Sequence, residues 1–323
     1  MNELNPKVSI VIPVYNGSDF LREAIDSALA QSYRNTEVLV VNDGSRDGGK
    51  TEAIALSYGA KIRYLPKQNG GVASALNLGI REMTGDYFSW LSHDDLYHPT
   101  KTEEQVRLLL EAGGDAVIYG DYEYIDGDGK RLGTKRTESA QSCGVHFSLI
   151  MEGTINGCTV MIPRSCFDEV GFFSEELKTT QDFDMWFRLA EKYPFLHQAK
   201  VLVKSRVHPN QGSLTIPGHL AEQNALYLKA LVIFSAKDLP KGTGETMASF
   251  YIKAAIRFVS IGCGEAADDA ISKFKGELYR DAPARIVINL GRFTEYALLR
   301  AAYRSRKIKA LVKKINKLVS SLR

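Results

Sequence analysis

Four short segments that carry aspartate or histidine follow one another along the first two-thirds of the chain, most of them where an apolar run ends. They are Asn42-Asp43-Gly44-Ser45, His93-Asp94-Asp95, Gln181-Asp182-Phe183-Asp184 and Arg206-Val207-His208. In an α/β sheet, buried strands that stop at polar groups mark the edge where ligands bind. We therefore expect these segments to form a single site.

The first two strand ends offer chemistry suited to a nucleoside. Pro13-Val14-Tyr15-Asn16 closes the first apolar run, and Asp43 follows the second. If the two strands are neighbours, Tyr15 can stack on a nucleobase while Asp43 accepts a ring N–H, as recognition of uracil requires. For Asp43-Gly44 alone, the alternative is a tight turn into a helix.

Asp94 and Asp95 suggest a divalent cation. Adjacent carboxylates repel each other and are costly to bury, and a cation shared with a phosphate would relieve that cost. Oxygen ligands suit Mg²⁺ or Mn²⁺. Asp94 is the expected ligand, whereas Asp95 is either a second ligand or the cap of a helix that begins near Pro99. His208 is a further candidate ligand or phosphate donor, with an ordinary surface histidine as the alternative.

The apolar patterns predict a wound sheet with parallel neighbours, because strands and helices alternate at short intervals. Strands are expected at 8–13, 37–41, 61–65, 87–91, 115–119 and 199–207, and helices at 20–29, 72–83, 99–113 and 180–193. Residues 121–144 are polar and glycine-rich, which predicts a hairpin or loop. The predicted divisions are an α/β domain (1–214), a helical region (215–299) and a basic amphipathic helix (300–323).

Composition limits the other classes. The chain has 323 residues, of which 44% are hydrophobic, and a net charge of +3 that does not argue for nucleic acid. Four cysteines without a C-x-x-C pair, no secretory signal and no long apolar run predict a cytoplasmic protein.

After Glu295 every charged side chain is basic, and apolar residues recur on one helical face from Ile308 to Leu322. This helix would lie on an anionic membrane surface, or pack on its own domain or another subunit.

Five motifs in order carry a resemblance to a known family. They are Pro13-Val14-Tyr15-Asn16, Asp43-Gly44-Ser45, Asn69-Gly70-Gly71-Val72 with Ala75-Leu76-Asn77-Leu78-Gly79, Asp94-Asp95, and Gln181-Asp182 with Trp186. Over about residues 7–213 the chain is similar to family two of the nucleotide-sugar glycosyltransferases. Each motif alone is weak, but their shared order is specific. The resemblance implies the GT-A fold and inversion at the anomeric carbon of the transferred sugar.

The resemblance also implies roles for individual residues. The nucleotide site would comprise Pro13, Tyr15, Asp43, Asn69, Asn77 and Asp94. Asp182 would be the base that deprotonates the acceptor, with Asp184 as its rival; a capping carboxylate is the alternative for Asp182. Because Asp182 falls in the first turn of a helix, we expect the helix dipole to keep it ionised and weakly basic. Trp186 would lie near the acceptor sugar, with core packing as the alternative.

Three positions depart from the family pattern. Ser92 and Asn42 stand where the family usually has aspartate, and Leu76 stands where it often has an arginine placed for phosphate. Lys67 is a candidate replacement for that arginine. The substitution at Asn42 should matter little if Asp43 reads the base.

The sequence thus predicts an inverting, metal-dependent transferase that moves a hexose from a UDP- or dTDP-sugar to a glycan or lipid-linked acceptor in cell-surface polysaccharide synthesis. Ser92 and Leu76 motivate an alternative, a non-catalytic nucleotide-sugar binder or scaffold. A sugar-phosphate nucleotidyltransferase is disfavoured because residues 13–17 include no basic side chain. The sugar, the acceptor and the linkage are not predicted.

Overall fold

The computed structural model describes residues 5–137, 144–153, 155–209, 211, 216–281 and 283–304. The chain divides into two compact units, Met1–Thr137 with Ile155–Thr215 and Glu138–Thr154 with Ile216–Arg323. The second unit resumes at Ile216, and the sequence predicts a division near residue 214. The sequence does not predict that residues 138–154 leave the first unit and belong to the second.

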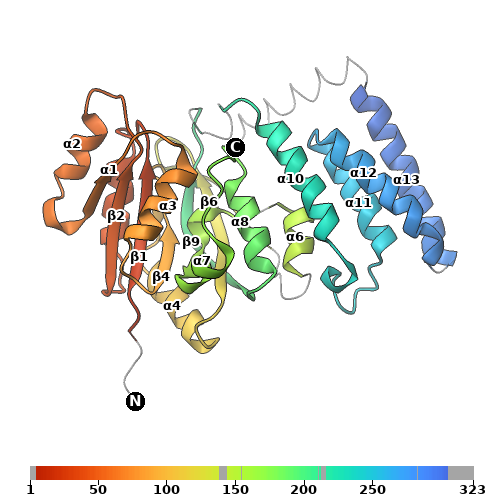
Figure 1. Cartoon of the computed structure of the whole chain (residues 1–323), viewed down its shortest axis with the longest axis horizontal. Helices are drawn as coiled ribbons and strands as arrows, with labels where there is room; N and C mark the ends of the chain where they lie inside the picture. Colours follow the sequence, from red (N-terminus) through yellow and green to blue (C-terminus); the bar gives the residue numbers. More distant parts are fainter. Residues whose placement is uncertain are drawn as a thin grey trace. The chain divides into compact units, whose positions relative to one another are not determined.

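One half of the sheet in unit 1 is parallel (Figure 1). It consists of β1 (Val8–Val14), β2 (Thr36–Asn42), β3 (Arg63–Pro66) and β4 (Tyr87–Trp90) in the spatial order β3-β2-β1-β4. All seven residues of β1 are buried, as in a central strand of a sheet covered on both faces. Since the strands are parallel, the loops that follow β1, β2 and β4 meet at the same edge.

The other half makes the sheet mixed. It consists of β5 (Leu96–Tyr97), β6 (Val117–Ile125), β7 (Arg131–Lys135), β8 (Met161–Pro163) and β9 (Phe195–Arg206). β8 runs antiparallel to β4 and β6, while β6 runs parallel to β9 and forms a hairpin with β7. The β6–β7 turn and β7 lie within residues 121–144, where a hairpin or loop is predicted. The short strands β5 and β8 are not predicted by the sequence.

Six helices accompany the sheet in the described part of unit 1. They are α1 (Leu21–Leu29), α2 (Lys50–Leu56), α3 (Val72–Glu82), α4 (Lys101–Glu111), α7 (Ser165–Val170) and α8 (Gln181–Ala190). α1 begins one residue after its expected start, at Leu21, and α4 begins two residues after its expected start, at Lys101. β5 separates Asp95 from α4, so the prediction that Asp95 caps this helix is wrong.

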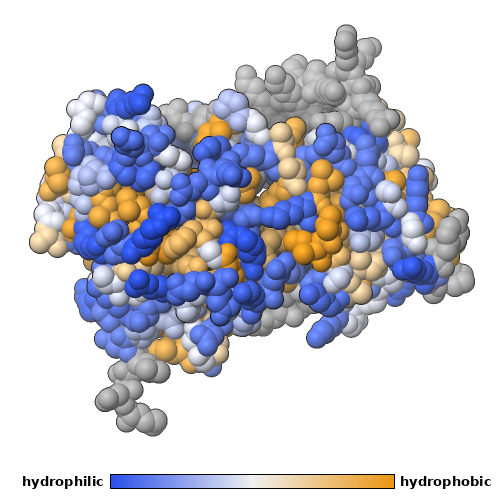
Figure 2. All heavy atoms as spheres, in the orientation of Figure 1, coloured by the Kyte–Doolittle hydropathy of each residue, from blue (hydrophilic) through white to orange (hydrophobic). Residues whose placement is uncertain are grey.

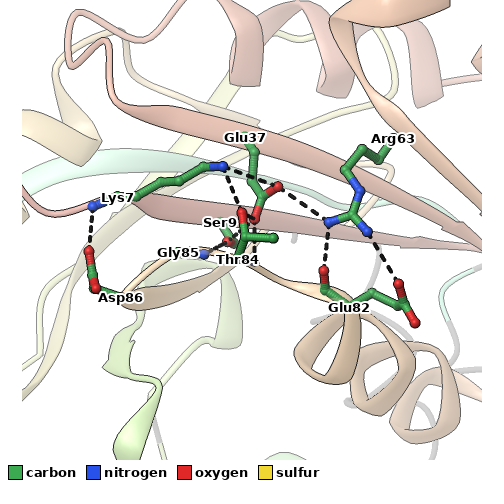
Figure 3. Close-up of polar contacts among 8 residues, drawn as sticks. All are labelled: Lys7, Ser9, Glu37, Arg63, Glu82, Thr84, Gly85 and Asp86. Atoms are coloured by element: carbon green, nitrogen blue, oxygen red, sulfur yellow. Dashed lines mark hydrogen bonds and ion pairs between the residues drawn. The ribbon is translucent and has the colours of Figure 1, made fainter.

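The edge of the sheet where β1 and β2 begin carries a closed polar network (Figure 3). The carboxylate of Glu37 accepts hydrogen bonds from the Ser9 hydroxyl and the Thr84 amide, each at 2.6 Å. Lys7 and Arg63 lie 3.5 and 3.4 Å from its second oxygen. Burial opposes ionisation, yet the hydrogen bonds from Ser9 and Thr84 and the Lys7 charge lower the pKa of Glu37 to about 2. The network therefore ties β1, β2, β3 and the turn before β4 together.

Unit 2 is helical in its described residues. Its helices are α6 (Val145–Met151), α10 (His219–Ile233), α11 (Met247–Ser260), α12 (Gly264–Glu277) and α13 (Pro283–Arg304). The helices of this unit are interrupted near residues 240–242 and begin again at Pro283, and α13 continues past the expected division at 299–300. Residues 305–323, the rest of the predicted amphipathic helix, lie outside the described residues. Among the described helices, none has both the length and the apolar character needed to cross a bilayer.

α6 joins the core of unit 2 although it comes from the middle of the chain. Its His146 ring nitrogen Nδ1 lies 2.9 Å from Asp238 Oδ1, and the Arg257 guanidinium of α11 donates to the carbonyl of Ile150 at 2.9 Å. The ring of Phe147 in α6 packs against that of Phe250 in α11, with centroids 5.8 Å apart. These contacts attach α6 to the second unit.

Candidate active site

The loops after β1 and β2 are bonded to each other at the sheet edge where the site is predicted. The amide of Asn16 donates to the Ser45 hydroxyl at 2.9 Å, and its side-chain oxygen accepts from the Arg46 amide at 2.6 Å. Asn16 adopts a φ of 51°, which turns the chain sharply after the strand. Pro13 is buried within β1, whereas Tyr15 is 44% exposed. Tyr15 therefore presents an accessible aromatic ring at this edge.

Asp43 is 3% exposed and organises the loop that leads into α3. Its Oδ1 accepts from Lys67 Nζ at 2.7 Å and from the Gly70 amide at 3.0 Å, and its Oδ2 accepts from the Gly71 amide at 2.8 Å. Asn69 donates to the Asp43 carbonyl at 2.9 Å. Oδ2 keeps acceptor capacity for one more donor. Lys67 is committed to Asp43, so it does not take the place of the arginine that the family often has at Leu76.

Asn77 positions a loop and does not face a ligand. Its side-chain amide donates to the Phe173 carbonyl and to Glu175 Oε1, both at 2.9 Å, and accepts from the Phe173 amide. Because Asn77 is buried and both amide hydrogens are used, the prediction that it contacts the nucleotide is wrong. The neighbouring Leu76 is core. The bonds from Asn77 fix the segment that precedes α8.

Asp94 and His208 form the central pair of the site. Asp94 Oδ2 lies 2.9 Å from His208 Nε2, and both side chains are largely buried. The Phe20 ring packs on His208 with centroids 5.3 Å apart. Although burial opposes it, the hydrogen bond from His208 lowers the pKa of Asp94, and the same bond raises the pKa of His208. The predicted convergence of these two residues, 114 positions apart in sequence, is present in the structure.

Asp95 faces the framework behind this pair. Its Oδ1 accepts from the Arg206 amide at 2.8 Å at the end of β9. Burial, with the adjacent charge of Asp94, raises the pKa of Asp95 to about 7. Ser92, at the position where the family usually has aspartate, accepts a hydrogen bond from the buried Cys158 thiol at 3.3 Å. Asp95 is therefore placed as a support for β9, and the prediction that it is a metal ligand is not supported.

Asp182 lies in the first turn of α8, half-buried. Its carboxylate accepts from the Phe183 amide at 2.8 Å, and among the described residues no cation pairs with it. Burial raises the pKa of Asp182 to about 6, which outweighs the stabilising effect of the helix N-terminus. The carboxylate is therefore still mostly ionised at neutral pH, as expected, but it is a stronger proton acceptor than an ordinary aspartate and not a weaker one.

Asp184 and Trp186 are both buried side chains of α8. Asp184 is buried, and its Oδ2 accepts from Arg188 Nε at 2.8 Å one turn along the helix. Trp186 is 0% exposed and packs edge-on against Phe173 with centroids 6.2 Å apart. The predictions that these two residues contact the acceptor are wrong, and core packing, the alternative for Trp186, is correct.

Comparison with known proteins supplies the family. The family described as "Glycosyl transferase family 2" matches residues 9–171, which include Tyr15, Asp43 and Asp94. The chain belongs to glycosyltransferase family 2. An uncharacterized glycosyltransferase of Rickettsia bellii is 45% identical over 287 residues, which are 88% of this chain but 41% of that relative. The chain thus spans less than half the length of this relative.

Solved structures of glycosyltransferases share the fold of this family 2 chain. TarS 1–349 of S. aureus, in complex with UDP-GlcNAc, has a TM-score of 0.61 and 17% identity over 92% of this chain and 91% of that chain. The mannosyltransferase PcManGT of Pyrobaculum calidifontis, in complex with GDP-Man and Mn²⁺, has a TM-score of 0.58 and 15% identity over 98% and 86% of the two chains. At such identities the similarity confirms the predicted GT-A fold.

The side chains of this family 2 site offer few metal ligands. Across the described residues, no cluster of three or more His, Cys, Asp and Glu side chains forms a complete metal cage. Asp94 and His208 supply one carboxylate and one imidazole. Such a pair fits a divalent cation that takes its remaining ligands from a diphosphate and water.

Proposed function

We propose that this family 2 glycosyltransferase is an inverting hexosyltransferase that takes a UDP- or dTDP-sugar as donor. The proposal rests mainly on the environment of Asp182. Its side chain is a carboxylate with a pKa of about 6 and no cationic partner among the described residues, at a helix N-terminus in unit 1. Support for a nucleotide-sugar donor comes from the UDP-GlcNAc bound to S. aureus TarS and the GDP-Man bound to PcManGT.

The nucleoside would lie on the loops after β1 and β2. The exposed ring of Tyr15 provides a stacking surface for the base. Asp43, held by Lys67 and by the amides of Gly70 and Gly71, keeps one acceptor position on Oδ2 for the ring N–H of uracil or thymine. Asn69, also in this loop, is exposed and would contact the nucleoside from the α3 side.

Asp94 and His208 would hold Mn²⁺ or Mg²⁺ together with the diphosphate. The bound cation would offset the negative charge that grows on the leaving diphosphate. In the transfer itself, a hydroxyl oxygen of the acceptor forms a bond to the anomeric carbon while the bond from that carbon to the diphosphate oxygen breaks on the opposite face. Asp182 accepts the hydroxyl proton as the new bond forms, and the configuration is inverted.

The acceptor would be a glycan or a lipid-linked sugar in cell-surface polysaccharide synthesis, reached at an anionic membrane surface. α13 exposes Val287 and Leu298 at 70% and 69%, and the segment that follows it is rich in lysine and arginine. Apolar residues also reach the surface over α10, whose Val232 is 78% exposed (Figure 2). Apolar side chains beside basic ones suit the interface of an anionic bilayer.

Calorimetry with UDP and dTDP, with and without Mn²⁺, tests the donor site on the wild type and on Asp94→Asn. Binding that requires Mn²⁺ and is weakened by the substitution would support the proposal. Proton NMR of the transfer product would then give its anomeric configuration. Absence of binding to both nucleotides would reject the transferase, whereas unchanged binding without turnover would favour a non-catalytic nucleotide-sugar binder.

A further inference from the structure

Arg206, the last residue of β9, is an unusual residue in this site because it is 1% exposed and yet carries a full charge. A buried guanidinium is stable only when its donors are paired, since the cost of removing it from water is large. His208, two residues further along, is the candidate metal ligand or phosphate donor of this segment. The contacts of Arg206 show that its side chain is already used within the protein.

The guanidinium of Arg206 joins three separate parts of unit 1. Nε donates to the carbonyl of Asp94 at 2.9 Å. Nη1 donates to the carbonyls of Gly127 at 2.8 Å and Asp126 at 3.3 Å, both in the β6–β7 turn. Nη2 pairs with Glu23 Oε2 of α1 at 2.8 Å. One planar side chain thus connects α1, the β6–β7 turn and the loop after β4.

The backbone around Arg206 adds to this connection. Its amide donates to Asp95 Oδ1 at 2.8 Å, and its carbonyl accepts from Gln211 Nε2 at 2.7 Å. The ring of Phe20 lies 4.4 Å from the guanidinium carbon. Two residues further along, His208 meets the Asp94 carboxylate. Segments 94–95 and 206–208 are therefore fastened at three points, two of which belong to Arg206.

We propose that Arg206 is a positioning residue that fixes the Asp94 carboxylate and the His208 imidazole relative to each other for a bound cation. The proposal rests on the function proposed above, in which this pair holds the metal–diphosphate. Arg206 contributes no ligand of its own, because a guanidinium donates hydrogen bonds and has no acceptor to offer a cation. Lysine would not replace it, since a single ammonium cannot bond Asp94, the β6–β7 turn and Glu23 at once.

The test compares Arg206→Lys and Arg206→Gln with the wild type in two titrations. Calorimetry with UDP at increasing Mn²⁺ measures the apparent affinity for the cation, and calorimetry with uridine measures base recognition alone. We expect the Mn²⁺ affinity to fall by about 10- to 100-fold, the range found when groups that orient metal ligands are removed. Uridine affinity should stay within about twofold, because Tyr15 and Asp43 do not contact Arg206.

Arg188→Lys is the matched control. Arg188 also bonds a carboxylate, Asp184, and two backbone carbonyls at the end of α7 and just after it, those of Val170 and Phe172, but it does not contact Asp94 or His208. A general loss of rigidity would therefore affect both variants alike. We expect Arg188→Lys to lower the melting temperature and to leave the Mn²⁺ affinity unchanged.

Glu23→Gln keeps the test decisive if the Arg206 variants do not fold. The Glu23 side chain is 54% exposed, so its loss should leave the fold intact while weakening one of the contacts of Arg206. A Mn²⁺ affinity about two- to threefold below that of the wild type would support the proposal. Wild-type Mn²⁺ affinity in the folded Arg206 variants, or in Glu23→Gln when neither of those variants folds, would overturn it. A wild type that binds UDP equally well without Mn²⁺ would reject the metal site itself.

Discussion

The two ends of the parallel strands treat carboxylates in opposite ways. Where β1 and β2 begin, Glu37 is surrounded by two hydroxyls, an amide and two cations, and its pKa is about 2. At the other end of the parallel strands lie Asp43 and Asp94, and the same unit carries Asp182, which has one neighbouring amide as donor and a pKa of about 6. Burial raises the pKa of both Glu37 and Asp182, so the difference lies in their partners. The fully paired carboxylate of Glu37 stabilises the sheet, and the sparsely paired carboxylate of Asp182 can exchange a proton.

Removing the sparsely paired carboxylate of Asp182 should have the largest effect on activity. Asp182→Asn is expected to lower kcat by about 10²- to 10⁴-fold, because the side chain can no longer accept the acceptor proton. Steady-state kinetics with a measured donor affinity would check this, and the donor affinity should be retained. Asp184→Asn, two residues along α8, is the control: it should lower the melting temperature and have the smaller effect on kcat. Equal loss of kcat in both variants would contradict the assignment.

Removing the fully paired carboxylate of Glu37 should affect stability alone. Glu37→Gln is expected to lower the free energy of unfolding by about 3 kcal/mol near neutral pH, since a depressed carboxyl pKa contributes stability above its unfolded value. That contribution is present above 4.5 and is lost as the pH falls through about 2. Urea denaturation at neutral and strongly acidic pH would measure it. A difference between variant and wild type that does not shrink in acid would be inconsistent with the network.

Asp94 tests the intermediate case, a carboxylate whose side chain is hydrogen-bonded to one titratable group, the His208 imidazole. Asp94→Asn is expected to weaken the Mn²⁺-dependent binding of UDP by about 10- to 100-fold, because the amide is a poorer ligand and its pairing with His208 changes. Calorimetry with and without Mn²⁺ would measure the loss. Asp86→Asn, whose carboxylate accepts from the Lys7 amide at the opposite edge, should bind UDP as the wild type does.

The raised pKa of Asp182 predicts the pH dependence of the wild type. Protonated Asp182 cannot act as a base, so kcat should rise with pH and level off above about 6. Below that midpoint the rate should fall about tenfold for each pH unit. A pH–rate profile with a saturated acceptor would measure the midpoint. A rising limb near pH 4 would instead indicate an unperturbed carboxylate or a different base.

The smallest effect is expected from the loss of a single hydrogen-bond donor in the network around Glu37. The buried Ser9 hydroxyl donates to Glu37 and accepts from the Gly85 amide at 3.0 Å. Ser9→Ala should lower the free energy of unfolding by about 1 kcal/mol, since the other partners of Glu37 remain. The midpoint of urea denaturation would show it. A loss as large as that of Glu37→Gln would mean that Ser9 alone holds the network.

The sequence predicts the framework because its signals are local. Apolar runs that end at Asp43 and Asp94 mark the strands and their ligand-binding ends without knowledge of distant contacts. Short strands such as β5, with two residues, contain too few positions for a period of two to be recognised. Lys101, fully buried with its Nζ 4.1 Å from the centre of the Tyr97 ring, has no signal in the sequence at all.

The errors within the site have a common physical cause. A motif residue can contact the ligand or can hold the loop that does, and its identity alone does not distinguish the two. The partner of Asn77 is Phe173, 96 residues away, which only the fold reveals. The partner of Asp184 is Arg188, four residues along the same helix, and this spacing is a visible signal of an ion pair. The positioning role of Arg206 is hidden in the same way as that of Asn77, since its side-chain bonds reach 79 to 183 positions back along the chain.

Residues 138–154 belong to the second unit although they precede the last part of the first unit in the chain, and this has a consequence for folding during synthesis. α6 leaves the ribosome before β8 and β9, and long before α10 and α11, the helices that it contacts. Its side chains Leu149 and Ile150, which are buried in the folded protein, therefore lack their final neighbours while most of the second unit is still being synthesised. During translation this short apolar segment is a natural place for a chaperone to bind.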